Sequence, residues 1–154
     1  MGKTSTRRAA GGIAESGYRL DEQIGFLLRC AYQRATGNLL SQIGAHDLTT
    51  PQFATLTRLY ERGRVSQNLL GRLVAMEPAN IRDVVLRLRK RRLVKTERAL
   101  DDGRRTLVSL TRSGTVLVED LIPVEIESTA RTLAPLKPSE RRILLALLRR
   151  IAQG

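Results

Sequence analysis

Cysteine and histidine, two residue types that catalytic and metal sites often use, are nearly absent from this 154-residue chain. The single cysteine, Cys30, excludes an internal disulfide and a CxxC metal motif, and the single histidine, His46, leaves too few ligands for zinc. No Gly-rich phosphate loop is present, and the acidic residues are scattered along the chain. We therefore expect a protein that is not an enzyme and that holds no metal and no cofactor.

Aromatic residues are also scarce, with two Phe, three Tyr and no Trp. Proteins that bind RNA or single-stranded DNA stack bases on aromatic side chains, so this scarcity argues against that class. No apolar run approaches the ~18 to 20 residues of a membrane span, and residues 1–17 contain no secretory signal. Together with the cysteine content, this predicts a cytoplasmic protein that does not bind membranes.

Positive charge, by contrast, is in excess: the chain has 27 Lys and Arg, 15 acidic residues and a net charge of +12. Residues 78–105 contribute ten Lys or Arg and four acids, a net charge of +6. Such a cationic region attracts phosphates and releases counterions when it binds them, which favours duplex DNA as the partner. Alternatively, the run Arg89–Arg92 is a solvated helix end, where cations also suit the helix dipole.

Two short amphipathic segments lie at the start of this basic region, one just before it and one inside it. Ser66 is a good N-cap for the first, and Pro78 suits the first position of the second. Only residues 75–77 remain for a turn, and the small Gly71 lies where the two helices would approach each other. This pattern predicts a helix-turn-helix whose second helix enters the major groove by its N-terminal end. The apolar residues at helical spacing are Leu69, Leu70 and Leu73, then Ile81, Val84, Val85 and Leu88.

The segments on either side of this motif have recognisable patterns. The spacing of apolar residues predicts a long amphipathic helix from Leu20 to Ile43. Thr50-Pro51 should cap the next helix, which we expect to end near Gly63. Two β-prone segments, 93–98 and 106–110, predict the strands of a hairpin, called the wing below. The predicted buried face of the second helix comprises Phe53, Leu56, Leu59 and Tyr60.

The C-terminal part of the chain is predicted to be helical again. Ser113-Gly114 opens a helix that Pro123 should kink or break, and a Leu-rich helix follows Pro138. The apolar helices at both ends are not needed to complete the DNA-binding unit and would bury well against a second copy, giving a dimer. The predicted parts are a flexible arm (1–17), a dimerisation helix (18–47), a winged helix-turn-helix lobe (48–112) and C-terminal dimerisation helices (113–154).

Four segments carry a resemblance to a known family, and the third of them is the most specific. They are Leu48–Phe53, Leu69–Leu88, Asp102-Gly-Arg104 followed by Leu110-Thr-Arg-Ser-Gly114, and Leu136–Glu140. From about Leu20 to Gln153 the chain resembles the MarR family of bacterial winged-helix regulators, nearest to repressors of aromatic or nicotinate catabolism. The resemblance implies a mainly α-helical fold with a small β-hairpin wing, and an obligate dimer formed by the N- and C-terminal helices.

A DNA-contact surface follows from the helix-turn-helix and from this resemblance. By similarity, Arg104 enters the minor groove, where narrow A·T-rich stretches attract a guanidinium. Asp102 orients Arg104 or closes the turn, and an alternative is that Asp102 and Gly103 only form a tight hairpin turn. The predicted DNA-binding residues are Ser66, Gln67, Pro78, Ala79, Asn80, Arg82, Asp83, Arg87, Asp102, Arg104 and Arg105.

Many members of the family respond to aromatic carboxylates or phenols. An Arg beside a Tyr can hold a carboxylate and a ring, so we predict an effector site. The alternative is that these polar groups are exposed or lie at a dimer interface. The predicted effector residues are Arg29, Tyr32, Gln33, His46 and Thr50.

The chain departs from the family pattern at two positions. Arg92 stands where the family often has Gly after the recognition helix, and a left-handed conformation is costly for Arg, so we expect a differently shaped exit. Cys30 lies five residues beyond the position of the family's peroxide-sensing cysteine, and is either a redox-active thiol or an inert small apolar residue.

The sequence thus predicts a transcriptional regulator, expected to be a repressor, that binds a palindromic operator in double-stranded DNA as a homodimer. A small aromatic acid or phenol would release it. The alternatives are a non-specific architectural DNA-binding protein and a thiol-based redox sensor that uses Cys30.

Overall fold

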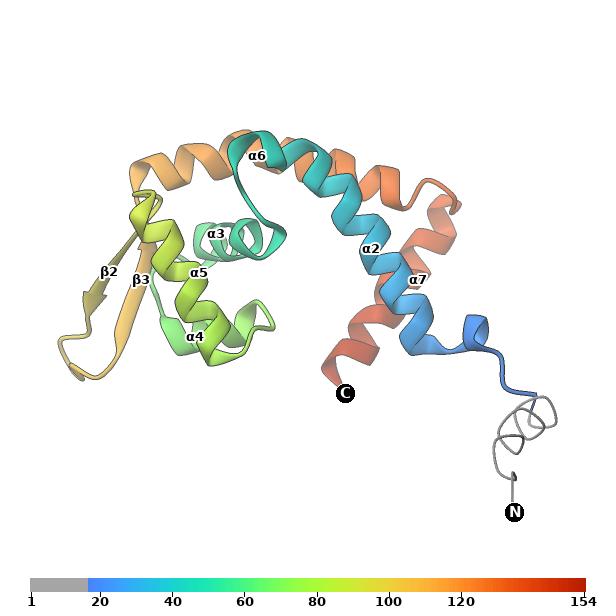
Figure 1. Ribbon diagram of the computed structural model, residues 1–154, viewed down its shortest axis with the longest axis horizontal. Helices are drawn as coiled ribbons and strands as arrows, with labels where there is room; N and C mark the ends of the chain where they lie inside the picture. The colour runs from blue at the N-terminus through green and yellow to red at the C-terminus, as the bar shows by residue number, and fades with distance from the viewer. Residues whose placement is uncertain (1–16) are drawn as a thin grey trace, which may run out of the picture. The chain divides into compact units, whose positions relative to one another are not determined.

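The computed structural model describes residues 17–154 (Figure 1). It forms two compact units, one ending at Arg34 and the other comprising Ala35–Gly154. The predicted flexible arm lies outside the described residues except for Gly17. The elements are η1 (Leu20–Glu22), α2 (Ile24–Ile43), η2 (Gly44–His46), α3 (Thr50–Arg62), β1 (Val65–Ser66), α4 (Gln67–Leu73), α5 (Pro78–Lys90), β2 (Val94–Arg98), β3 (Thr106–Leu110), α6 (Arg112–Thr132) and α7 (Pro138–Gln153).

The described part of the first unit contains η1 and the beginning of α2. The long helix predicted from Leu20 starts as a 3-10 turn, in which the Gln23 side-chain amide donates to the carbonyl oxygen of Arg19 at 2.9 Å. The α-helix itself begins at Ile24. Further along α2, the guanidinium of Arg29 lies 5.5 Å from the ring centroid of Phe26, within the range of a cation–π contact.

In the second unit, a three-stranded antiparallel sheet has the order β1-β3-β2. The predicted wing is confirmed as the β2–β3 hairpin, with Val94 opposite Leu110 and Arg98 opposite Thr106. Strand β2 begins at Val94, one residue later than expected. The third strand, β1, was not predicted, because two residues carry no measurable alternation.

The core of the second unit lies between α3, α4, α5, α6 and the sheet. Three residues of the predicted face of α3 are buried, but Tyr60 is 41% exposed. The Tyr60 hydroxyl donates to Glu119 Oε1 of α6 at 3.1 Å, and this hydrogen bond and the carboxylate charge raise the pKa of Tyr60. The fully buried apolar side chains are Ile43, Leu56, Leu59, Leu70, Ile81, Leu88, Val94, Val108, Val118 and Leu121.

Most predicted helix ends are confirmed. Ser66 caps α4, Pro78 is the first residue of α5, and α3 ends at Arg62 with Gly63, which has a φ of 70°, as its C-cap. The cap of α3 is Thr49 rather than Thr50, because the Thr49 hydroxyl accepts from the Gln52 amide while the Gln52 side chain accepts from the Thr49 amide. This reciprocal pair is a capping box, which satisfies two backbone donors at once.

Pro123 does not break α6, which is continuous from Arg112 to Thr132. Of the two predicted effects of Pro123, the break is therefore wrong, and the kink stays a prediction. Proline removes one backbone hydrogen bond, but buried Val118, Leu121 and Ser128 anchor the helix on both sides of it. Among residues 17–154, no helix is long and apolar enough to cross a membrane.

Candidate nucleic-acid interface

The two helices of the motif meet at Gly71, as predicted. A Cβ there would lie 3.1 Å from Ile81 Cγ2 and 3.2 Å from the carbonyl oxygen of Met76. The Met76 amide donates to the Gly71 carbonyl oxygen at 2.9 Å, and Ala75 has a φ of 53° in the turn. The close contact and this short turn hold α4 and α5 in a helix-turn-helix.

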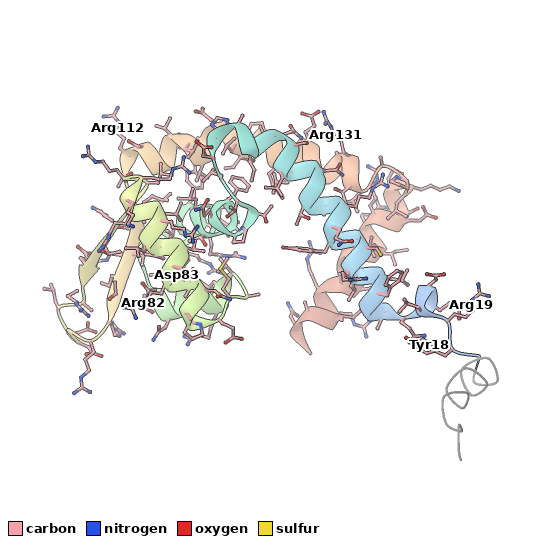
Figure 2. The ribbon with its side chains drawn as sticks, viewed as in Figure 1. Tyr18, Arg19, Arg82, Asp83, Arg112 and Arg131 are labelled. Carbon is pink, nitrogen blue, oxygen red and sulfur yellow. The ribbon has the colours of Figure 1, made fainter. Side chains whose placement is uncertain are left out.

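The recognition helix, α5, buries one face and exposes the other. Ile81, Val85 and Leu88 are buried against the core. Figure 2 labels two of the exposed side chains, Arg82 and Asp83. All six residues of α5 predicted to contact DNA are exposed, namely Pro78, Ala79, Asn80, Arg82, Asp83 and Arg87.

The beginning of α4 also belongs to this predicted surface. Ser66 and Gln67 are half-buried, and the Ser66 hydroxyl accepts from the Leu69 amide at 3.3 Å. Ser66 therefore has a structural role as an N-cap, and its contact with DNA stays a prediction.

The end of the wing is held together by hydrogen bonds from Asp102 and its neighbours. Asp102 Oδ1 accepts from the Arg104 amide at 3.0 Å, and the Asp102 carbonyl oxygen accepts from the Arg105 amide at 2.9 Å. The Arg98 guanidinium donates to the Gly103 carbonyl oxygen at 3.2 Å. Of the predicted roles for Asp102, closing the turn is thus the one supported by contacts. This places the Arg104 side chain, which is exposed, on a braced turn.

The exposed arginines of this surface differ in their partners. Arg105 forms an ion pair with Asp101 at 3.0 Å. By contrast, no acid within residues 17–154 pairs with Arg82, Arg87 or Arg104. These three guanidinium groups can therefore bind phosphates or bases without first giving up an ion pair.

Arg92 adopts the left-handed conformation, with a φ of 58°, so the expected change in the exit from α5 is wrong. The Arg92 amide donates to the Arg89 carbonyl oxygen at 2.9 Å, and the Leu93 amide donates to the Leu88 carbonyl oxygen at 3.0 Å. These two bonds form a Schellman motif, and the burial of Leu88 and Leu93 accompanies it. The contacts offset the steric cost of a non-glycine residue here, which is about 1 kcal/mol or somewhat more.

The segment Leu110–Gly114 connects the wing to α6. The Thr111 hydroxyl donates to the Arg92 carbonyl oxygen at 2.7 Å and accepts from the Gly114 amide at 3.1 Å. A Cβ at Gly114 would lie only 2.0 Å from the carbonyl oxygen of Leu93. Close packing therefore accounts for Gly114 in this family-like segment, because the start of α6 lies against the backbone that leaves α5.

Part of the basic run Arg89–Arg92, at the C-terminal end of α5, is bound to the protein itself. Arg89 donates to Thr96 Oγ1 at 3.3 Å, and Arg91 donates to the carbonyl oxygens of both His46 and Asp47 at 2.8 Å. Arg89 and Arg91 are exposed and yet bonded to the protein, and the alternative that Arg89–Arg92 is a solvated helix end stays a prediction.

The predicted effector residues are divided between the two units. Arg29, Tyr32 and Gln33 are exposed in the first unit, while His46 is exposed and Thr50 half-buried in the second. Their grouping into one site stays a prediction. Cys30 is exposed, and its redox role likewise stays a prediction.

Three buried polar atoms of the second unit that the sequence did not suggest lack a hydrogen-bond partner within the described residues. They are Gln42 Nε2, Thr57 Oγ1 and Glu125 Oε2. Burial also raises the pKa of Glu125. The sequence could have indicated the buried Glu125, because this acid stands between Val124 and Ile126, and an acid in an apolar stretch of helix is costly unless it is paired.

Replacing this carboxyl group should therefore change stability with pH. Because burial raises the pKa of folded Glu125, its contribution to stability is complete at acid pH and falls as pH rises through that value. We expect Glu125→Gln to raise the melting temperature by roughly 2 to 4 °C at pH 7.5 and by less at pH 4. Thermal unfolding across this pH range checks the prediction, with Glu127→Gln, which removes an exposed ion pair, as the control. A gain that grows toward acid pH would contradict it.

A helix-turn-helix with an exposed basic helix, followed by an antiparallel hairpin, defines a winged-helix DNA-binding regulator. The chain belongs to the MarR family of these transcriptional regulators. A family model described as transcriptional regulator SarA/Rot matches residues 38–121. The chain is 36% identical to the HTH-type transcriptional repressor NicR of Pseudomonas putida over 151 residues, which are 98% of this chain and 95% of NicR.

Solved structures show the same similarity. A probable transcriptional regulator from Pseudomonas aeruginosa is 47% identical, with a TM-score of 0.81 over 86% of this chain and 99% of that one. Bordetella bronchiseptica BpsR, whose DNA binding is regulated by 6-hydroxynicotinic acid, is 35% identical, with a TM-score of 0.84 over 89% of this chain and 98% of that one. The predicted family and the winged-helix fold are thereby confirmed.

Proposed function

We propose that the protein is a transcriptional repressor that binds a palindromic operator as a homodimer and is released by a small aromatic acid. The observation that carries this proposal is the pair of DNA-sized elements, α5 and the wing, whose exposed Arg82, Arg87 and Arg104 have no acidic partner among residues 17–154. Cationic groups held on rigid elements bind phosphates and base edges without reorganisation.

The two elements would read different grooves. The major groove carries a distinct pattern for each base pair, and the N-terminal part of α5 exposes an amide, a guanidinium and a carboxylate at Asn80, Arg82 and Asp83. These side chains suit adenine, guanine and cytosine respectively. The wing would place Arg104 in the adjoining minor groove, where width and negative potential favour A·T pairs.

A dimer is supported by apolar surface on the terminal helices. On α7, Ile143, Leu147 and Ile151 recur at a spacing of four residues and are 59%, 46% and 59% exposed. In the first unit, Ile24 and Leu27 are also exposed. A second copy would remove this surface from water, and a twofold dimer would place two recognition helices about 34 Å apart, which matches a palindrome.

Release by an aromatic acid is supported by the relatives. NicR is named a repressor, and the DNA binding of BpsR is regulated by 6-hydroxynicotinic acid. We therefore choose 6-hydroxynicotinic acid and benzoate as the first probes. A ligand that binds the folded state alone raises its melting temperature with occupancy. Release from DNA should accompany that rise.

Selection from a pool of duplexes with random cores tests the proposal. The expected product is a palindrome that the protein binds as a dimer and prefers by roughly 10³-fold or more over random duplex at physiological salt. Equal affinity for both would refute the proposal and favour an architectural DNA-binding protein. The same binding assay with each probe acid then tests release.

Replacing Arg82 tests the role of the recognition helix. We expect Arg82→Ala to weaken binding to the selected duplex by about 10-fold and to reduce discrimination at one base pair of each half-site. Competition with single-base variants of that duplex measures both effects. A uniform loss across all duplexes would instead identify Arg82 as a phosphate contact.

A further inference from the structure

One arginine of the basic run is directed at the backbone of another element. Arg91 Nη1 donates to the Asp47 carbonyl oxygen and Nη2 donates to the His46 carbonyl oxygen, each at 2.8 Å. Two parallel bonds from one planar guanidinium fix direction as well as distance. Arg91 therefore ties the C-terminal end of α5 to the segment that connects α2 to α3.

That connecting segment is itself well held. Asp47 has a φ of 53°, and its amide donates to the Gly44 carbonyl oxygen at 3.0 Å. Ile43 and Leu48, on either side of the segment, are both buried. The two carbonyl oxygens that Arg91 binds thus belong to a segment fixed to the core.

The same end of α5 is bound on another side by α6. The hydroxyl of Thr111, the N-cap of α6, donates to the Arg92 carbonyl oxygen, and the Thr111 amide donates to the Leu93 carbonyl oxygen at 3.1 Å. Residues Arg91–Leu93 therefore join the end of the recognition helix to the segment that follows α2 and to the start of α6. A shift of that segment or of α6 would displace these residues.

The predicted DNA-contacting end of α5 lies far from Arg91–Leu93, so a small tilt of the helix at these residues displaces that end by a larger distance. At about 1.5 Å per residue, the twelve-residue interval from Ala79 to Arg91 is a lever of roughly 18 Å. A tilt of about 5° at Arg91–Leu93 would move the N-terminal end by about 1.5 Å, which exceeds the range of hydrogen-bond lengths. Contacts to bases would be lost after a small displacement.

The geometry points to Arg91 as a positioning residue of the recognition helix, one that acts through the backbone of residues 46 and 47 and does not contact DNA. This inference rests on the proposed function. It assigns to Arg91 a role opposite to that of Arg82 and Arg87 in the same helical region, which have no acidic partner within the described residues. Through Arg91, displacement of residues 46 and 47 changes DNA affinity.

Salt dependence separates positioning from phosphate contact. We expect Arg91→Met, which keeps the apolar stem and loses the donors, to weaken binding to the selected duplex by about 10-fold, because two charge-assisted hydrogen bonds are lost. The slope of log affinity against log salt should stay that of the wild type, whereas Arg87→Ala, the matched control, should reduce it. Arg91→Lys, which retains a donor, should restore part of the affinity.

Hydrogen exchange supplies a readout that general destabilisation would not imitate. Because coupling between sites is reciprocal, DNA should slow amide exchange in residues 44–49 of the wild type. In Arg91→Met this protection by DNA should disappear, while Arg87→Ala should retain it at saturating DNA. Should Arg91→Met fail to fold, Arg91→Lys supports the same two measurements.

The outcomes distinguish this inference from the proposed function. Failure of the wild type to discriminate between duplexes would refute the proposed function. Discrimination by the wild type, together with unchanged affinity in Arg91→Met, a reduced salt slope in that variant, or undiminished protection of residues 44–49, would overturn the role of Arg91 alone.

Discussion

Gly114→Ala should strongly destabilise the protein. The added methyl group would lie 2.0 Å from the carbonyl oxygen of Leu93, a backbone atom that cannot rotate away. That carbonyl oxygen accepts hydrogen bonds from both the amide and the hydroxyl of Thr111. Relief therefore requires α6 to separate from the exit of α5. We expect a loss of more than about 3 kcal/mol, which is a large part of the stability of a typical domain.

Two other glycines provide a graded control. A Cβ at Gly71 would lie 3.1 Å from a side-chain carbon of Ile81 and 3.2 Å from a backbone oxygen, so Gly71→Ala should cost less, about 1 to 2 kcal/mol. At Gly37 in α2 nothing lies within 4 Å, and Gly37→Ala should raise stability by about 0.5 to 1 kcal/mol. Chemical denaturation of the three variants gives the order, and equal stability of Gly114→Ala and Gly37→Ala would contradict the argument.

The features that the sequence predicts correctly are those that local signals determine. Apolar spacing, Ser66 as a cap and Pro78 at a first helical position depend on a few neighbouring residues. Ser66 and Pro78 were confirmed, and so was the spacing except at Leu69, which is 37% exposed. The exposed face of α5 follows from the same spacing, since Ile81, Val85 and Leu88 fix which side is buried. The exposed face of α5 could therefore be predicted, because its orientation depends on the residues of that helix alone.

Three of the errors, at Arg92, Tyr60 and Arg91, concern contacts with distant partners. Arg92 has a poor local preference for a positive φ, but the burial of Leu93 and the bonds from Thr111 hold it there. Tyr60 fits the apolar spacing of α3, yet its hydroxyl is directed to Glu119, 59 residues away. Arg91 lies in a run that suggests phosphate binding, but its partners are backbone carbonyl oxygens 44 and 45 residues earlier. No local pattern marks such partners.

Replacing Arg104 should have the largest effect on DNA binding while leaving the fold intact. The Arg104 side chain is exposed, and its backbone amide, rather than its guanidinium, takes part in the turn with Asp102. Arg104→Ala therefore keeps the turn and removes only the groove contact. A dimer loses that contact twice, and at about 1.4 kcal/mol for each, toward the lower end of the range for a specific base contact, affinity for the selected duplex should fall by about 100-fold.

Varying the base pairs opposite the wing tests the role of Arg104 more sharply. A guanidinium in the minor groove gains most where A·T pairs narrow it, so the loss in Arg104→Ala should be large on duplexes with A·T pairs at that position and small on those with G·C pairs. Arg149→Ala, which removes the same charge from an exposed position on α7, should change affinity less than twofold on either duplex. Equal losses on both duplexes would assign Arg104 to phosphates, since phosphate contacts are indifferent to sequence, whereas unchanged affinity would remove the wing from the interface altogether.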